Sequence, residues 1–269
     1  MLLSCPTSAA GLTIAGLQCL NLLAGVNEIA SPTPYSKFAS ASSSPLASIG
    51  GGDLGSRDGM LVIYVPPAAT AATALAFAPA MNGREVIVGS LLLIHFAKRV
   101  METLFVHRYS GCMKAATAAF IGTFYSLVTL LISVMQFNVP ASVYAGADDM
   151  LAAALALFAV GQVGNLWHHK LLADMRRPAE AKATAAAPAS EYKVPTGGLF
   201  DYVTMPHYLF EITAWLGIAL AAQQLNALLV ALGMASYLSG RAMATTRWYQ
   251  EKFGKDFPED RRHLVPFLF

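Results

Sequence analysis

The stretch "GGLFDYVTMPHYLFEITAWLGIAL", residues 197–220, places a Pro-His-Tyr triplet and a glutamate inside an apolar run long enough to cross a bilayer. A transmembrane helix needs about 20 mostly apolar residues, because it must satisfy its own backbone hydrogen bonds inside lipid. His207, Tyr208 and Glu211 are costly at membrane depth unless they are paired or face a wet cavity. They are therefore the first candidates for a functional site.

The whole chain has the composition of a polytopic membrane protein. Its 269 residues are 55% hydrophobic and only 13% charged, and the mean hydropathy is +0.50. The apolar runs predict an all-α membrane bundle of about seven transmembrane helices, near residues 8–27, 60–80, 85–105, 115–137, 150–172, 203–222 and 225–246. We divide the chain into residues 1–82, with helices one and two and a Ser/Gly-rich loop, and residues 83–269, with the remaining helices.

The positive charges predict the orientation of the bundle. With seven spans, the loops after helices one, three, five and seven share one side of the membrane. These loops and their helix ends hold most of the basic residues, namely Lys37, Arg57, Lys98, Arg99, Arg108, Lys114, Lys170, Arg176, Arg177, Lys182 and Lys193. The opposite loops hold Arg84. The positive-inside rule then places the C-terminus in the cytosol and the N-terminus in the lumen or exterior. A net charge of +2 does not point to nucleic acid as a partner.

Ionisable residues follow helical stripes near the predicted cytosolic ends. In the third helix, His95, Lys98, Arg99 and Glu102 are spaced at i, i+3, i+4 and i+7. A functional role competes here with a plain Lys98–Glu102 ion pair that neutralises itself. In the fifth helix, the adjacent pair His168 and His169 could suggest a metal. Six scattered histidines do not supply the histidine boxes of a diiron membrane enzyme, so we predict no metal.

The remaining stripes converge on the same side. Asn165, His169 and Arg176 share one face of the fifth helix, and Arg241 shares a stripe with Tyr249 in the seventh. Together with His207 and Glu211 they predict a positively charged bowl, suited to a phosphate-bearing cofactor. The alternative is a set of side chains that snorkel to the interface. We expect Arg241 to be held by ligand phosphate or by a carboxylate, for which Glu211 is the available partner.

Several motifs in order along the chain resemble one family. They are "YSKF" (35–38), "HFAKRVMETLFVHRYSG" (95–111), "GNLWHHKLLADMR" (164–176), "EYKVPTGGLFDYVTMPHYLFEI" (191–212), "GRAMATTRWYQEKF" (240–253) and the terminal "LVPFLF" (264–269). The chain is similar to the steroid 5α-reductase family, which includes very-long-chain enoyl-CoA reductases and polyprenol reductases. Within it, the chain most resembles a plant-type group of reductase-domain proteins.

The resemblance implies a multi-pass enzyme of the endoplasmic reticulum membrane. Such an enzyme transfers hydride from NADPH to the β-carbon of a C=C bond conjugated with a carbonyl. Membrane lipids and a lipid substrate are the expected partners, and the substrate stays open between a 3-oxo-4-ene steroid, a trans-2-enoyl-CoA and a polyprenoid enone. The residues implied to line the NADPH site are Asn165, His169, Arg176, Tyr192, His207, Glu211, Arg241, Tyr249 and Lys37.

Hydride addition leaves an enolate, whose charge must be stabilised or protonated. Steroid-reducing members resemble each other in a glutamate on helix two and a tyrosine on helix three, and the aligned positions here are Tyr64 and Phe96. The enoyl-CoA reductase branch implies Lys98 and Tyr208 as active residues. We predict Tyr208, supported by Lys98, as the proton donor, in competition with Tyr64.

Two other classes of function stay open. Isoprenylcysteine-type membrane methyltransferases share a related helical core with a His-Pro-x-Tyr motif and a late pair of glutamates. Here the order is Pro-His-Tyr, at residues 206–208, and no Glu-Glu pair follows. The third class is a lipid-binding scaffold that kept the fold and lost activity, which the altered positions Tyr64 and Phe96 would explain.

Overall fold

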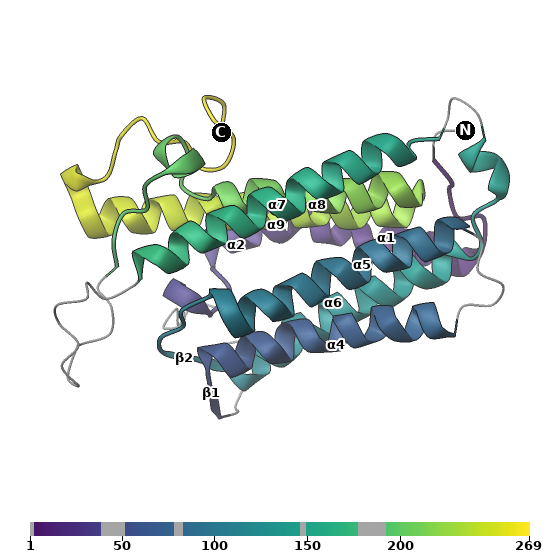
Figure 1. Ribbon diagram of the computed structural model, residues 1–269, viewed down its shortest axis with the longest axis horizontal. Helices are drawn as coiled ribbons and strands as arrows, with labels where there is room; N and C mark the ends of the chain where they lie inside the picture. The colour runs from purple at the N-terminus through teal and green to yellow at the C-terminus, as the bar shows by residue number, and fades with distance from the viewer. Residues whose placement is uncertain (1–2, 39–51, 78–82, 146–148, 177–191) are drawn as a thin grey trace.

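Long helices that run nearly side by side build the described part of the chain (Figure 1). The computed structural model describes residues 3–38, 52–77, 83–145, 149–176 and 192–269. The chain starts with α1 (Ala9–Cys19), a 3₁₀ turn (Leu20–Leu23) and α2 (Ala24–Ala30), which follow one another as a single rod. A second 3₁₀ turn, Ser36–Phe38, lies in the loop that follows.

The other long helices form two groups. The first contains α4 (Ser56–Ala76), α5 (Gly83–Met101) and α6 (Ala115–Gln136), and the second contains α7 (Leu151–Met175), α8 (Pro206–Ala222) and α9 (Leu225–Phe253). In Figure 1, α4 to α6 lie below α7 to α9, and α1 and α2 pass behind them along α9. Further short 3₁₀ turns lie at Ala141–Tyr144, Gly198–Asp201 and Gly254–Asp256.

Five of the described helical segments are long and apolar enough to cross a membrane: Ala9–Ala30, Ser56–Ala76, Ala115–Gln136, Leu151–Met175 and Leu225–Asp256. The prediction of a polytopic helical membrane protein is therefore confirmed. The third and sixth predicted spans are helices as well, α5 and α8. However, α5 carries Arg84, Glu85, Lys98 and Arg99, and α8 has only 17 residues. Seven spans and the orientation of the termini stay predictions, as does the division at residue 82.

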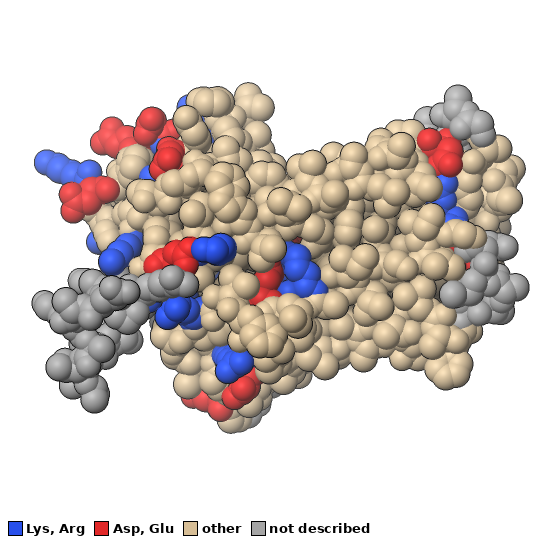
Figure 2. Space-filling view, in the orientation of Figure 1, with Lys and Arg blue, Asp and Glu red and all other residues tan. Residues whose placement is uncertain are grey.

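The surface agrees with a membrane environment. Figure 2 shows charged side chains mainly at the two ends of the molecule, with one charged group part-way along an otherwise uncharged flank. Large apolar side chains such as Leu130, Leu155 and Val163 are exposed on the long helices. In water such an exposed apolar surface would promote aggregation, whereas in a bilayer it contacts the apolar lipid chains.

Two short strands, which the sequence did not predict, accompany the helices. β1 (Asp53–Gly55) pairs antiparallel with β2 (Cys112–Lys114), and Lys114 forms an ion pair of 2.9 Å with Asp53 opposite it. Each strand has three residues, too few to show the alternating pattern that would reveal it in a sequence. The pair joins the start of α4 to the start of α6, so it fixes the end of the bundle at which the ionisable residues gather.

The core lies between the two groups of helices. Leu92 and Phe96 of α5, Ile132 of α6, and Trp215 and Ile218 of α8 are all buried there. Helices α7 and α8 approach closely because Gly161 has no side chain: a Cβ atom at this position would lie 2.4 Å from the backbone nitrogen of Ala214. This close contact holds the polar residues of α7 and α8 against each other.

The C-terminal tail folds back on the protein. Val203 and Arg262 form a parallel bridge, in which the amide of Thr204 donates to the carbonyl of Arg262 at 2.8 Å. The guanidinium of Arg261 donates to the carbonyl of Pro195 at 2.8 Å. These bonds hold the segment before α8, and with it the Pro-His-Tyr triplet, in place.

Candidate active site

Two adjoining polar cavities lie at the end of the bundle marked by β1 and β2. The first, here called the polar cavity, has a volume of about 180 Å³. Its walls include Tyr64, Arg99, His107, Asn165, His169, Arg176, His207, Tyr208 and Glu211. The second, the basic cavity, has about 110 Å³ and is lined by Lys37, Arg176, Tyr192, His207, Tyr208, Arg241, Tyr249 and others. Every residue predicted from the sequence to hold the cofactor lines at least one of them.

A buried carboxylate organises the wall of the polar cavity. The last turn of α5 continues as a π-helical turn, Glu102–Val106, a form often found at functional sites. Glu102, which is 1% exposed, accepts a hydrogen bond from Lys98 at 2.9 Å and one from Arg99. His169 of α7 lies 3.2 Å from the same carboxylate. The i, i+3, i+4 spacing seen in the sequence thus produces the expected contacts, including the Lys98–Glu102 pair.

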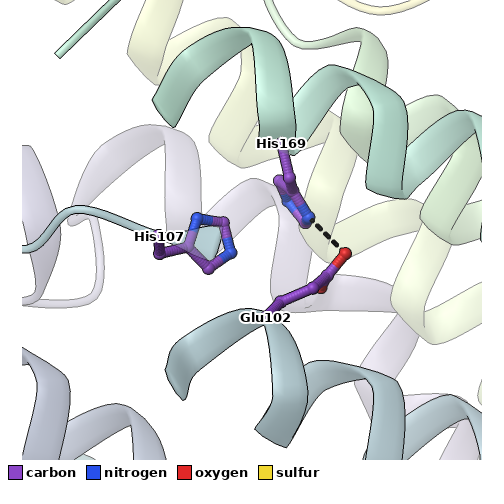
Figure 3. A group of neighbouring side chains, drawn as sticks. All are labelled: Glu102, His107 and His169. Atoms are coloured by element: carbon purple, nitrogen blue, oxygen red, sulfur yellow. Dashed lines mark hydrogen bonds and ion pairs between the residues drawn. The ribbon is translucent and has the colours of Figure 1, made fainter. Parts of the chain in front are cut away.

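Glu102, His107 and His169 form a group whose ligand atoms lie within 4.8 Å of one another (Figure 3). Such a group could hold a metal ion by geometry. The carboxylate, however, is already engaged by Lys98 and Arg99, and Arg99 Nη1 also lies 2.9 Å from His169 Nδ1. Two neighbouring cations oppose a divalent ion at this point. The arrangement fits a hydrogen-bond network better than a metal centre, and the absence of a metal stays a prediction.

The network continues from Glu102 across the bundle. Arg99 donates to the hydroxyl of Tyr64 at 2.9 Å, which ties α5 to α4. Lys98 donates to Asn165, whose amide nitrogen in turn donates to the carbonyl of His207 at 2.9 Å. Lys98 is not among the described residues that line either cavity, and its hydrogen bonds go to Glu102 and Asn165 rather than to Tyr208. Its predicted support of Tyr208 stays a prediction.

Glu211 has a partner that the sequence did not indicate. Its carboxylate lies 3.2 Å from Nε2 of the buried His95 on α5. The other ring nitrogen of His95 lies 2.9 Å from the amide nitrogen of Gln162 on α7. His95 therefore fixes a Glu211 oxygen at the wall of the polar cavity. The expectation that Glu211 would serve as the carboxylate partner of Arg241 is wrong.

The partner of Arg241 is Glu28, at the end of α2. The two side chains are 2% and 1% exposed and form an ion pair. Arg241 also donates to the carbonyls of Thr33 at 3.3 Å and Tyr35 at 3.1 Å. Sequence reasoning missed Glu28 because it lies 213 residues away. The signal was available, since a carboxylate near the end of a membrane span calls for a cationic partner.

The basic cavity contains a cationic and a polar group that could bind an anion. The Lys37 ammonium lies 4.3 Å from the centre of the Tyr249 ring. Burial, and then the charges of Arg241 and Arg176, lower the pKa of Lys37 from 10.5 to about 7. In addition, Nδ1 of the buried His207, on the wall shared by both cavities, lacks a hydrogen-bond partner among the described residues. A phosphate would satisfy such groups.

A third space, the apolar cavity, adjoins the polar one. It has a volume of about 370 Å³ and lies between α2, α6 and α9. Phe120, Phe124, Val230 and Met234 contribute to its walls. Three tyrosines, Tyr35, Tyr125 and Tyr237, line both the apolar and the polar cavity. The sequence did not single these tyrosines out, although Tyr237 precedes Arg241 by one helical turn.

Comparison with known proteins gives the family. The protein family described as "3-oxo-5-alpha-steroid 4-dehydrogenase" matches residues 112–269, which is more than half of the chain. The chain belongs to the 3-oxo-5-alpha-steroid 4-dehydrogenase family. Similar proteins include very-long-chain enoyl-CoA reductase of Dictyostelium discoideum, 32% identical over 65% of this chain and 55% of that protein. Steroid 5-alpha-reductase DET2 of Solanum lycopersicum is 36% identical over 43% of this chain and 41% of its own length.

The first of these relatives are matched over about half of their length. A more distant relative is matched almost throughout: 3-oxo-5-alpha-steroid 4-dehydrogenase 1 of Bos taurus is 29% identical over 88% of both chains. These names describe oxidoreductases that act on a C=C bond. The family match covers α6 to α9, and therefore most of the candidate site. Lys37, Tyr64 and Lys98 lie before it.

Proposed function

We propose that this member of the 3-oxo-5-alpha-steroid 4-dehydrogenase family is an NADPH-dependent membrane reductase of a lipid enone. The observation that carries this proposal is the order of the cavities. A basic cavity adjoins a polar one, which meets an apolar cavity at Tyr35, Tyr125 and Tyr237. This order suits a charged, water-soluble cofactor on one side and an apolar substrate on the other.

The residues present fit the phosphates of NADPH. Lys37 and Arg176 supply positive charge to the basic cavity, and guanidinium and ammonium groups are the usual partners of phosphate. His207 offers a buried ring nitrogen without a partner. When bound, NADPH supplies the hydride that adds to the β-carbon of the substrate. Arg241 contributes less than its charge suggests, because Glu28 already neutralises it.

The chain must also supply a proton. Hydride addition moves the π electrons onto the carbonyl oxygen, and a proton delivered to the α-carbon then restores the carbonyl. Tyr208 is our candidate donor, because it lines both the polar and the basic cavity next to His207. Tyr64 is the competing donor, and its hydroxyl accepts a hydrogen bond from Arg99. Water reaching the polar cavity would reprotonate either tyrosine.

The test is turnover of the purified full-length protein in detergent. NADPH absorbance is followed with a panel of three substrates: a 3-oxo-4-ene steroid, a trans-2-enoyl-CoA and a polyprenoid enal. We expect NADPH oxidation with at least one of them and a saturated product by mass spectrometry, with NADH as the matched control cofactor. Absence of oxidation with the whole panel would refute the proposal. Binding of S-adenosylmethionine without binding of NADPH would support a methyltransferase instead.

A further inference from the structure

The boundary between the polar and the apolar cavity is built from tyrosines. Tyr35 comes from the loop after α2, Tyr125 from α6 and Tyr237 from α9. If the hydride donor occupies the polar side and the lipid the apolar side, the reacting C=C bond lies at this boundary. The conjugated carbonyl oxygen, which gains negative charge as hydride adds, must find its hydrogen-bond donors there.

Two of these tyrosines already present their hydroxyl groups as a pair. Tyr35 Oη and Tyr237 Oη lie 3.2 Å apart. The two hydroxyls are hydrogen-bonded to each other, and the Tyr237 hydroxyl also contacts the Thr33 side chain. When a carbonyl oxygen lies about 2.7 Å from both, each hydroxyl can turn its single proton from these partners to that oxygen, because the three oxygens then form a nearly regular triangle. The ring of Tyr125 packs instead against Phe96 and Tyr64, with ring centres 5.5 and 6.3 Å away, and forms an aromatic wall.

The Tyr35–Tyr237 pair is fixed in position by Arg241. The guanidinium of Arg241 lies 3.7 Å from the centre of the Tyr35 ring and donates to the Tyr35 carbonyl. Arg241 is itself fixed by Glu28, and it lies one helical turn after Tyr237 on the same face of α9. Donors whose positions are fixed before the reaction stabilise developing charge most effectively.

We propose that the hydroxyls of Tyr237 and Tyr35 together bind the carbonyl oxygen of the enone lipid and stabilise the enolate oxygen. In this assignment the two tyrosines act on the oxygen, whereas Tyr208 delivers the proton to carbon. Tyr208 does not appear among the described residues of the apolar cavity, which agrees with this separation. The inference rests on the proposed function, since it requires a carbonyl-bearing substrate at the boundary.

The first test replaces Tyr237 by phenylalanine, which removes only the hydroxyl. With the enone that gives the highest turnover, we expect kcat/KM to fall by about 100-fold in Tyr237→Phe, as for the loss of one oxyanion donor. The dissociation constant for NADPH should change by less than about twofold, because Tyr237 is not among the described residues that line the basic cavity, to which we assign the phosphates. Tyr202→Phe, at a half-exposed tyrosine away from these cavities, is the matched control and should retain full activity.

The second test measures carbonyl recognition without turnover. Androst-4-en-3-one and androst-4-ene differ only in the carbonyl group, and their binding is compared by thermal shift in the wild type, Tyr237→Phe and Tyr35→Phe. Wild-type protein should prefer the ketone, and this preference should be lost in at least one folded variant. If both variants keep the wild-type preference for the ketone, or if the wild type binds neither compound, the inference is overturned. A wild type that oxidises no NADPH yet shows the tyrosine-dependent preference would refute only the proposed function.

Discussion

Two buried carboxylates of the described residues, Glu102 and Glu28, lie beside the cavities and are stabilised in opposite ways. Glu102 is paired with Lys98 and Arg99, four and three residues before it on the same helix. Glu28 is paired with Arg241, 213 residues later in the chain. The first pairing is local and belongs to α5 itself. The second joins α2 to α9, the last long helix, so it holds the tertiary structure together.

The two arginines also differ in the contacts that each retains when its carboxylate partner is removed. Arg99 keeps hydrogen bonds to Tyr64 and His169 if Glu102 is lost. The guanidinium of Arg241, in contrast, would keep contacts to neutral groups, among them the Tyr208 hydroxyl, the carbonyls of Thr33 and Tyr35, and the rings of Tyr35 and Phe38. Loss of Glu102 would thus leave Arg99 in a hydrogen-bond network, whereas loss of Glu28 would leave the buried charge of Arg241 without a carboxylate partner. Three experiments on stability test this contrast, and a fourth tests the basic cavity.

The largest effect is expected for Glu28→Gln. Removing one partner of a fully buried ion pair should lower the free energy of unfolding by about 3–5 kcal/mol. The carboxylate also accepts hydrogen bonds from the Thr33 amide at 3.0 Å and hydroxyl at 2.7 Å, so the loop should loosen as well. Chemical denaturation in detergent measures the change.

The control for this pair is a double-mutant cycle with Arg241→Met. If the pair is a structural contact, the double variant should be more stable than the sum of the single losses predicts, because the unpaired charge is gone. If the losses in the free energy of unfolding are additive, or if Glu28→Gln lowers it by less than about 1 kcal/mol, the long-range pair does not stabilise the packing of α2 against α9.

A smaller loss is expected for Glu102→Gln. Hydrogen bonds to charged groups contribute about 1.5–3 kcal/mol, and Arg99 and Lys98 retain other partners. The same denaturation experiment applies. Asp53→Asn, which breaks the half-exposed pair with Lys114, is the matched control and should cost at most about 1 kcal/mol. A larger loss for Glu102→Gln than for Glu28→Gln would reverse the comparison.

The interface that carries the long-range pair can also be overpacked. A Cβ atom on Gly25 would lie 2.2 Å from the carbonyl oxygen of Ser236, so α2 and α9 would have to separate. We expect Gly25→Ala to destabilise the protein by about 1–3 kcal/mol. Gly16→Ala on α1, where no atom lies within 4 Å of the added carbon, should be neutral or slightly stabilising. Equal melting temperatures for the two variants would contradict the close contact.

The smallest effect concerns the pH dependence of cofactor binding. The pKa of Lys37 is lowered to about 7, and a bound phosphate should raise it. Below pH 7 the ammonium is charged with or without ligand, so affinity is highest and constant. Above pH 7 affinity for NADPH should fall by up to about tenfold per pH unit, with proton uptake on binding.

Calorimetry in two buffers of different ionisation enthalpy measures that proton uptake. In Lys37→Met, the part of the uptake above pH 7 should disappear and the affinity at pH 6.5 should be lower. The same proton uptake in the variant and the wild type would remove Lys37 from the phosphate site.

The sequence predicted what depends on local spacing. Five of the expected spans, the Glu102 cluster, and the gathering of Asn165, His169 and His207 near one end follow from runs and stripes that a helix imposes. The strands β1 and β2 were missed because three residues carry no period. The Glu28–Arg241 pair and the tyrosine boundary were missed because they join segments whose proximity only the packing of α2 against α9 creates.

The long separation of Glu28 from Arg241 also has a consequence for the order of biosynthesis. While a ribosome makes the chain, the first helix enters the membrane long before the guanidinium that neutralises its carboxylate exists. Until α9 is inserted, the Glu28 carboxylate must stay near water, because an unpaired charge in lipid is costly. The last long helix therefore closes the structure, and truncation before residue 241 should leave the first loop unfolded even where every earlier helix has formed.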